Sequence, residues 1–305
     1  MARYLERAEH TARLLDVNLA LMLDQTPEAA ERRWERLTQS VAGMSLGTDP
    51  YAVVQALTFD PDNAASIISL IAAARENARQ VREQISTEMW EQLNRLYLQV
   101  RPATMEVMWR GEPHDYLHGV VKDGIHLFQG ITDATLSHGE GWQWLCTGRF
   151  IERAMATATL LDVHFEPGTM PSDYAQLSYL EWVGLLKSCT SFEAYCNTYT
   201  ADVRPERIAE YLLLNAESPR SVRFAADRVQ ESMHAIASAT GTRRADRVKR
   251  LSGRLQAALD YGQVDEIMAA GLRPYLAEIR RQCNQIDAAI FQSYMAYPIE
   301  TALAS

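Results

Sequence analysis

A short stretch of this 305-residue chain occurs twice. Residues 3–8 read Arg-Tyr-Leu-Glu-Arg-Ala and residues 149–154 read Arg-Phe-Ile-Glu-Arg-Ala, so the two copies are 146 residues apart. The match continues downstream, where Leu-Leu-Asp-Val occurs at 14–17 and again at 160–163. A repeat of this length predicts two similar helical units that stack in one fold. The polar residues shared by both copies are therefore the ones that a functional interpretation has to explain.

The repeat extends further when a gap is allowed. The first helix is followed by matches at an offset of 148, which pair Trp34, Leu37 and Ser40 with Trp182, Leu185 and Ser188. Later matches have an offset of 155 and pair Pro50, Leu57, Ser66 and Glu76 with Pro205, Leu212, Ser221 and Glu231. The change of offset predicts a seven-residue insertion near residues 195–204. We expect one domain, 1–305, of two intertwined pseudo-symmetric halves, about 1–140 and about 141–305.

Composition predicts an all-α protein. Ala, Leu, Arg, Glu and Gln dominate, and Gly and Pro fall mostly where helices should begin or end. No alternating apolar segment bounded by turn residues predicts a strand, so we expect a helical bundle. Residues 101–119 and 166–173 are expected to be irregular connections. The expected helix starts are Thr26-Pro27, Asp60 or Asp62, Ser172 or Asp173, and Ser218-Pro219.

Charge and cysteine usage restrict the class of partner. The formal net charge of −9 disfavours nucleic acid or an anionic membrane as the main partner. No uncharged apolar stretch of 18 residues occurs, so we expect neither a transmembrane helix nor a secretory signal. The four cysteines form no Cys-x-x-Cys pair, which is typical of reduced thiols in a cytoplasmic protein.

The repeated Arg-x-x-Glu-Arg element places charge on one side of each helix. A helical period puts Arg3, Glu6, Arg7 and His10 on one face, and the second copy has Arg149, Glu152 and Arg153 in the same places. The rest of the second helix is nearly apolar all round, so we expect it to be the more buried of the two. Buried charges persist only when they are paired and hydrogen-bonded.

Two interpretations of these charges remain open. In the first they are structural, and the Arg and Glu of one copy pair with the Glu and Arg of the other, or with Glu76 and Glu231, to join the halves. In the second they form a functional site at the junction, with Glu6, Arg7 and His10 as candidate catalytic residues. The first copy is the better place for such a site because it also carries Glu9 and Arg13.

A second group of arginines lies farther along the first half. Arg75, Arg79 and Arg82 follow one another at helical spacing, either as a solvated face with i,i+4 pairs or as an anion-binding face. Arg220, beside the helix start at Ser218-Pro219, is a further candidate for anion binding.

The sequence predicts no cofactor and no metal. It contains no glycine-rich phosphate loop, no Gly-x-Ser-x-Gly elbow, no His-Glu-x-x-His motif and no dinucleotide fingerprint. His114 and His118 are four residues apart, but Pro113 and Gly119 flank them and no third ligand stands out, so we expect no metal site there.

The sequence resembles the bacterial alpha-E family, which is named for its helical fold and its Glu-Arg motif. The resemblance covers essentially the whole chain and rests on four stretches: residues 3–16, residues 141–154, Ala74-Arg75-Glu76-Asn77-Ala78-Arg79 and Ser218-Pro219-Arg220-Ser221-Val222. Family members typically occur beside circularly permuted ATP-grasp ligases and transglutaminase-like proteases, or are fused to them. The resemblance therefore implies those proteins as partners, and a part in making or processing an amide-linked product.

We accordingly expect a non-catalytic helical adaptor or accessory subunit of an ATP-grasp-dependent amide or peptide ligase system. The alternative is an enzyme or substrate-carrying subunit in peptide synthesis or modification, with a charged site around Glu6 and Arg7. A ligand sensor that uses the Arg75–Arg82 face is a third possibility. An enzyme requires the motif side chains to converge in a cleft, whereas an adaptor does not.

The start of the chain differs from the family pattern. Members usually carry a short apolar segment with a tryptophan ahead of the first motif, as residues 142–145 precede the second motif here. This chain begins two residues before Arg3. We therefore expect the first helix to extend upstream and Met1 to be a late start.

Overall fold

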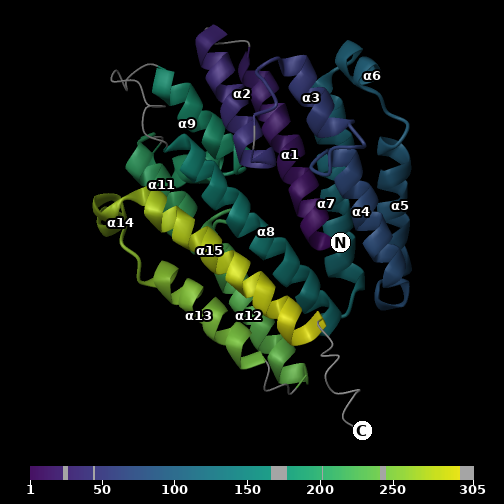
Figure 1. Ribbon diagram of the computed structural model, residues 1–305, viewed down its shortest axis with the longest axis vertical. Coiled ribbons are helices and arrows are strands. Elements are labelled where there is room, and N and C mark those ends of the chain that lie inside the picture. Colours follow the sequence, from purple (N-terminus) through teal and green to yellow (C-terminus); the bar gives the residue numbers. More distant parts are fainter. Residues whose placement is uncertain (23–26, 44, 166–176, 201, 241–244, 296–305) are drawn as a thin grey trace.

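The computed structural model describes residues 1–22, 27–43, 45–165, 177–200, 202–240 and 245–295, and every regular element in them is a helix (Figure 1). This confirms the all-α class for the described residues. The elements of the first half are α1 (Ala2–Leu21), α2 (Pro27–Ala42), α3 (Pro50–Thr58), α4 (Ile67–Gln80), the 3-10 turn η2 (Arg82–Gln84), α5 (Thr87–Val100), α6 (Met105–Arg110), the π-helix η3 (Asp115–Lys122) and α7 (Asp123–Thr135).

The second half begins with the longest helix, α8 (Glu140–His164). It continues with α9 (Leu177–Ser188), α10 (Phe192–Tyr199), α11 (Pro205–Leu214), α12 (Val222–Thr240), α13 (Ala245–Asp260), α14 (Val264–Ala270), α15 (Leu272–Ile290) and η4 (Phe291–Met295). The sequence expectations at Thr26, Ser172 or Asp173, and the connection 166–173 lie outside the described residues.

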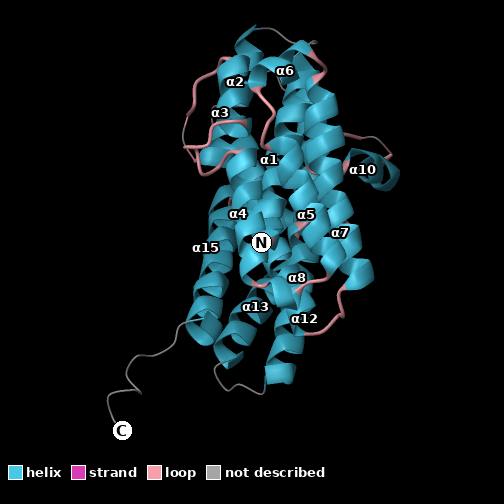
Figure 2. Ribbon diagram, turned by 90° about the vertical axis from the view of Figure 1, so that its right-hand side faces the viewer, coloured by secondary structure: helices cyan, strands magenta, loops and turns pink. Residues whose placement is uncertain are grey.

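Two central helices hold the bundle together. α1 packs against α4, α8, η3 and α9, while α8 packs against α12, α15 and α1. In Figure 1, α3 to α6 lie on one side of this pair and α13 to α15 on the other. Figure 2 shows most helices running close to the long axis, with α10 at the edge of the bundle. One hydrophobic cluster runs through both halves, from Leu5 to Ile290, and both central helices contribute buried residues to it.

The described helices also bear on the membrane expectation. None of them combines the length and the apolar character that a membrane crossing requires.

The start of α4 differs from the sequence expectation. Ser66, rather than Asp60 or Asp62, is the N-cap, and its hydroxyl accepts the backbone N–H of Ser69 at 3.3 Å. The carboxylate of Asp60 is engaged earlier, because it accepts the backbone N–H of Asp62 at 3.0 Å in a turn. An aspartate that closes its own turn is not available to cap a helix several residues later.

The start of α12 also differs from the sequence expectation. Ser218-Pro219 lies in a turn before the helix, because the side chain of Asn215 accepts the backbone N–H of Ser218 at 2.7 Å. The actual cap is Ser221, whose hydroxyl accepts the N–H of Phe224 at 3.0 Å. Hydroxyl capping of this kind satisfies one of the free donors of a first helical turn. The helix therefore begins at Val222. Ser221 corresponds to Ser66 at the repeat offset of 155, and each serine directly precedes its helix.

The expected irregular connection at 101–119 is largely helical. α6 ends at Arg110; the Thr104 hydroxyl caps its start and Gly111 is its C-cap residue, so threonine and glycine flank a helix here instead of lying in a continuous loop. The π-helix η3 follows almost at once. The apolar residues of both segments are buried at helical spacing, namely Met105, Met108, Leu117 and Val121. Burial of this stripe explains why the segment folds despite its prolines and glycines.

A close approach between α5 and α7 gives a test of the packing. A Cβ added at Gly124 would lie 2.7 Å from Cδ1 of the fully buried Leu96, whereas one added at Gly130 of the same helix meets nothing within 4 Å. We predict that Gly130→Ala raises the free energy of unfolding by about 0.5–1 kcal/mol through helix propensity. Gly124→Ala should lower it by about 1–3 kcal/mol through overpacking. Urea unfolding measures both, and equal stabilisation by the two substitutions would contradict this packing.

Candidate functional site

The two Glu-Arg motifs face each other where α1 packs against α8. Arg153 donates two hydrogen bonds to Glu6, from Nε to Oε1 at 2.7 Å and from Nη2 to Oε2 at 2.9 Å. Arg7 makes the same two-pronged contact with Glu152, from Nε to Oε1 at 2.7 Å and from Nη2 to Oε2 at 2.9 Å. Parallel bonds of this kind are the strong form of an arginine–carboxylate contact. Each motif thus supplies the glutamate for the arginine of the other.

This geometry is the pairing between copies that the structural interpretation of the repeat predicts. The other partners considered for the motif, Glu76 and Glu231, instead bind Arg79 and Arg228 on their own helices. The two cross-pairs differ in depth. The side chains of Glu6 and Arg153 are 1% and 8% exposed, whereas that of Arg7 is 37% exposed.

The shallow pair is extended towards the surface by Arg3. Its Nε donates to Oε2 of Glu152 at 3.0 Å, and its Nη1 donates to Oδ1 of Asp287 on α15 at 2.7 Å. Arg3 thereby links α1 to two helices of the second half.

The deep pair is extended inward by Arg220, which lies just before α12. Its guanidinium donates to Glu6 at 2.7 Å and to Glu9 at 2.8 Å, bridging the two carboxylates. Glu9 also forms an ion pair with Arg13, and Arg13 donates to the hydroxyl of Thr190 at 2.7 Å. The junction cluster therefore consists of Arg3, Glu6, Arg7, Glu9, Arg13, Glu152, Arg153 and Arg220.

Electrostatics keep both buried glutamates ionised. Burial alone raises the pKa of a carboxyl group, but the guanidinium groups of Arg220 and Arg153 hold the pKa of Glu6 below its ordinary value. For Glu9 burial again opposes ionisation, yet Arg13 and Arg220 hold its pKa well below the ordinary value. Both oxygens of Glu6 face guanidinium groups, whereas Oε1 of Glu9 has no hydrogen-bond partner among the described residues and lies 3.3 Å from Nε2 of His126.

His10, a candidate catalytic residue, and the buried thiol of Cys189 both have pKa values far from neutral pH. Burial, together with the charges of Arg13 and Arg220, lowers the pKa of His10 to about 4, which leaves the imidazole neutral at pH 7. An effective general base has a pKa near the working pH. Burial also raises the pKa of the Cys189 thiol to about 11, so the thiolate needed for nucleophilic attack is scarce.

The third arginine of the second motif does not join the cluster. Arg149 lies with its guanidinium 5.9 Å from the ring centroid of Phe150, and no carboxylate among the described residues pairs with it. Burial lowers its pKa. It lines a separate hollow of about 280 Å³ with Arg228 and Glu231 of α12. Its expected role as a structural ion-pair residue is therefore not seen in the described residues.

The other candidate arginines are engaged separately. Arg75 donates to Asn94 at 2.7 Å and lies over the ring of Tyr97, with 4.7 Å between guanidinium carbon and ring centroid. Arg79 forms an exposed pair with Glu76. Arg82 lies beyond the end of α4, in the turn η2, so the expected stripe is interrupted. Arg220, expected near an anion, already binds two carboxylates of the protein.

His114 and His118 lie together without forming a metal centre. Their ring centroids are 4.9 Å apart, and Nδ1 of His114 lies 2.7 Å from Oδ1 of Asp16. Across the described ranges, no group of three or more His, Cys, Asp or Glu side chains has a metal-binding arrangement.

Sequence reasoning missed the contacts of two further aspartates, Asp16 and Asp162, although the repeat contained the signal. Asp16 contacts the ring of His114 and accepts a hydrogen bond from Nζ of Lys122 at 3.2 Å. His114 immediately precedes η3, and Lys122 is the last residue of η3. The counterpart of Asp16 in the repeat, Asp162, accepts hydrogen bonds from two arginines of α15, Arg273 at 2.9 Å and Arg280 at 2.6 Å. Both aspartates lie in the repeated Leu-Leu-Asp-Val stretch, so their recurrence marked them as polar residues with a shared role.

The buried histidines predict how stability depends on pH. The pKa of His10 falls from 6.5 to about 4 on folding, so between these values the unfolded chain binds more protons than the native one. The contribution of His10 to the free energy of unfolding should therefore rise with pH from about 4 to 6.5. Above pH 6.5 this contribution is fully present. His10→Gln should flatten the rise by up to about 1.4 kcal/mol per pH unit. Urea unfolding from pH 4.5 to 7.5 measures the slope, with exposed His234→Gln as control; an unchanged slope in His10→Gln would contradict the burial argument.

Comparison with known proteins adds the family. A family model described as "a predicted alpha-helical domain with a conserved ER motif" matches residues 1–295. Uncharacterised proteins of Mycobacterium bovis and Mycobacterium tuberculosis are each 24% identical to this chain over 302 residues. These alignments cover 92% of this chain and 34% of each relative, so the chain spans about a third of the length of the curated relatives it matches. No solved structure matches it. Through this match over residues 1–295, which includes both reciprocally paired Glu-Arg motifs, the chain belongs to the Alpha-E family.

Proposed function

We propose that this chain is a non-catalytic adaptor or accessory module of an ATP-grasp-dependent amide or peptide ligase system. The observation that carries the proposal is the reciprocal pairing of the two motifs. Glu6 and Arg153, and likewise Arg7 and Glu152, neutralise each other across the junction. A carboxylate that is held ionised between guanidinium groups has no proton to donate, and little basicity with which to accept one. The characteristic residues of the family thus act on the architecture of the domain.

The proposal includes a doubled architecture. α1 contacts α4 and η3 as α8 contacts α12 and α15, and α4 contacts α5 as α12 contacts α13. α10 lies where the repeat predicts an insertion. We infer that the two halves are pseudo-symmetric and intertwined, with the motif pairs on the line between them. A rigid, internally paired centre of this kind suits a protein that presents surfaces to partners.

The relatives support a modular role. The chain aligns with only 34% of each mycobacterial relative, so in those proteins the domain is part of a longer polypeptide. By family resemblance the proposed partners are a circularly permuted ATP-grasp ligase and a transglutaminase-like protein. The proposal places the module in the cytoplasm, in keeping with its four unpaired cysteines.

The adaptor role predicts a stable complex. We expect the chain, co-expressed with the circularly permuted ATP-grasp ligase of the same genome, to co-elute with it in size-exclusion chromatography. ADP release by the ligase should fall when the chain is omitted. Arg7→Gln, which changes a partly exposed motif residue, should preserve both readouts, as should the matched surface variant Arg79→Gln. Separate elution of the two wild-type proteins would contradict the adaptor role.

One observation favours the substrate-carrying alternative. Arg3 and Arg7 line a hollow of about 570 Å³ together with Asn77, Gln80 and Trp144. These two arginines already pair with Glu152 and Asp287, so the hollow, with its polar and aromatic lining, suits a peptidic ligand. The same experiment separates the two functions: a complex that survives Arg7→Gln while product formation is lost would support the substrate-carrying role over the adaptor.

A further inference from the structure

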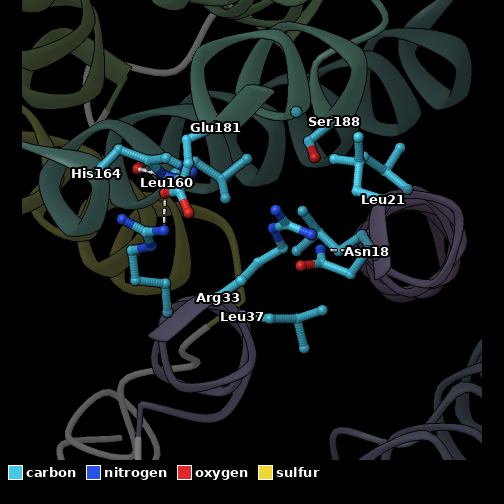
Figure 3. Close-up of a pocket in the computed structure, with 12 residues that line it drawn as sticks. Asn18, Leu21, Arg33, Leu37, Leu160, His164, Glu181 and Ser188 are labelled. Carbon is cyan, nitrogen blue, oxygen red and sulfur yellow. Dashed lines mark hydrogen bonds and ion pairs between the residues drawn. The ribbon is translucent and has the colours of Figure 1, made fainter. Parts of the chain in front are cut away.

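A second polar pocket lies away from the junction cluster, between α1, α2, α8 and α9 (Figure 3). Leucine side chains from three of these helices form its apolar walls, namely Leu14, Leu21, Leu37 and Leu160. The unfilled space is about 20 Å³, enough for one occupant the size of a water molecule. The polar groups around this space are Asn18, Arg33, Arg36, His164, Glu181 and Ser188.

The charges around this pocket do not balance. Arg36 forms an ion pair with Glu181, so these two groups compensate each other. Arg33 is only 7% exposed, and both of its Nη atoms are buried without a hydrogen-bond partner in the described parts of the chain. Figure 3 shows its side chain reaching from α2 towards Asn18. One guanidinium charge is therefore left without a counter-charge.

The remaining polar groups do not supply a negative charge. Burial and the nearby Arg36 and Arg33 lower the pKa of His164 to about 3, so this imidazole is neutral at pH 7. Its Nδ1 lies 2.7 Å from the backbone oxygen of Leu160. The side-chain amide N–H of Asn18 donates to the backbone oxygen of Leu14, and its uncharged Oδ1 has no hydrogen-bond partner among the described residues. Burial lowers the pKa of Arg33 to about 10, which still leaves the guanidinium protonated at pH 7.

The repeat explains how the excess charge arises. At the offset of 148 that aligns Trp34 with Trp182, Arg33 corresponds to Glu181 and Arg36 to Gly184. The first half thus contributes two cations to this pocket, and the second half contributes one anion. An unpaired charge that is taken out of water is strongly unfavourable, so a counter-ion is the expected completion of the site.

We propose that this pocket binds one small monovalent anion of halide size, held by the guanidinium of Arg33. The space excludes larger oxyanions such as sulfate or phosphate, and the hydroxyl of Ser188 is a further donor among the residues that line it. The bound ion links α2 to α1, α8 and α9. This site is independent of the adaptor role and of the junction cluster.

The experiment measures how the melting temperature depends on chloride. Chloride replaces gluconate at constant ionic strength, because gluconate is too large for the pocket. A ligand that binds only the native state raises the melting temperature in proportion to the logarithm of its concentration above its Kd. We expect this rise in the wild type and in Arg32→Gln, which changes the exposed neighbouring arginine, and its loss in Arg33→Gln.

Two results would overturn the proposal: no chloride dependence in the wild type, or the same dependence in Arg33→Gln. A wild-type crystal soaked in bromide gives a second readout in case Arg33→Gln does not fold. An anomalous peak within hydrogen-bond distance of the Nη atoms of Arg33 is expected. A water molecule at that position, with bromide only on the surface, would refute the site.

Discussion

The reciprocal pairing of the two Glu-Arg motifs is the contact on which the arrangement of the halves depends. Glu6 with Arg153, and Arg7 with Glu152, can form all four of their bonds only when α1 and α8 lie face to face in one register. A shift of either helix by one residue would rotate a charge by about 100° into an apolar core, at a large desolvation penalty. The packing of α4 and η3 on α1, and of α12 and α15 on α8, follows from that placement.

Such pairs specify a structure more than they stabilise it. Removing two charges from water costs several kcal/mol per ion, which the contact between them only partly returns. In the deep half of the junction, Arg220 bridges the carboxylates of Glu6 and Glu9 and supplies part of the positive charge that holds them ionised. Charged groups that are paired with one another are poorly suited to catalysis. They can hold the domain rigid while it presents its surface to a partner. This consideration connects the central contact to the proposed adaptor role.

Sequence alone predicted the helical class, and it offered the cross-pairing of the motifs as one of two open interpretations, because both are expressed in short periodic patterns. It named Arg220 as a candidate for anion binding, since the turn before α12 looks like an open helix start, and only tertiary packing brings Glu6 and Glu9 to it. It also gave Arg149 the role of Arg3, although no carboxylate of the described residues lies opposite Arg149. The uncompensated Arg33 has no local signal, because its surroundings come from four helices.

A double-mutant cycle on Arg7→Gln and Glu152→Gln tests the central claim most directly. We predict a coupling free energy of about 1–3 kcal/mol in urea unfolding, since the pair joins two helices across the junction. The matched cycle is Arg79→Gln with Glu76→Gln, an exposed pair with the same two-pronged geometry within one helix, and its coupling should be clearly smaller. A coupling for Arg7 and Glu152 no larger than that of the exposed pair would contradict the view that the motifs join the two halves.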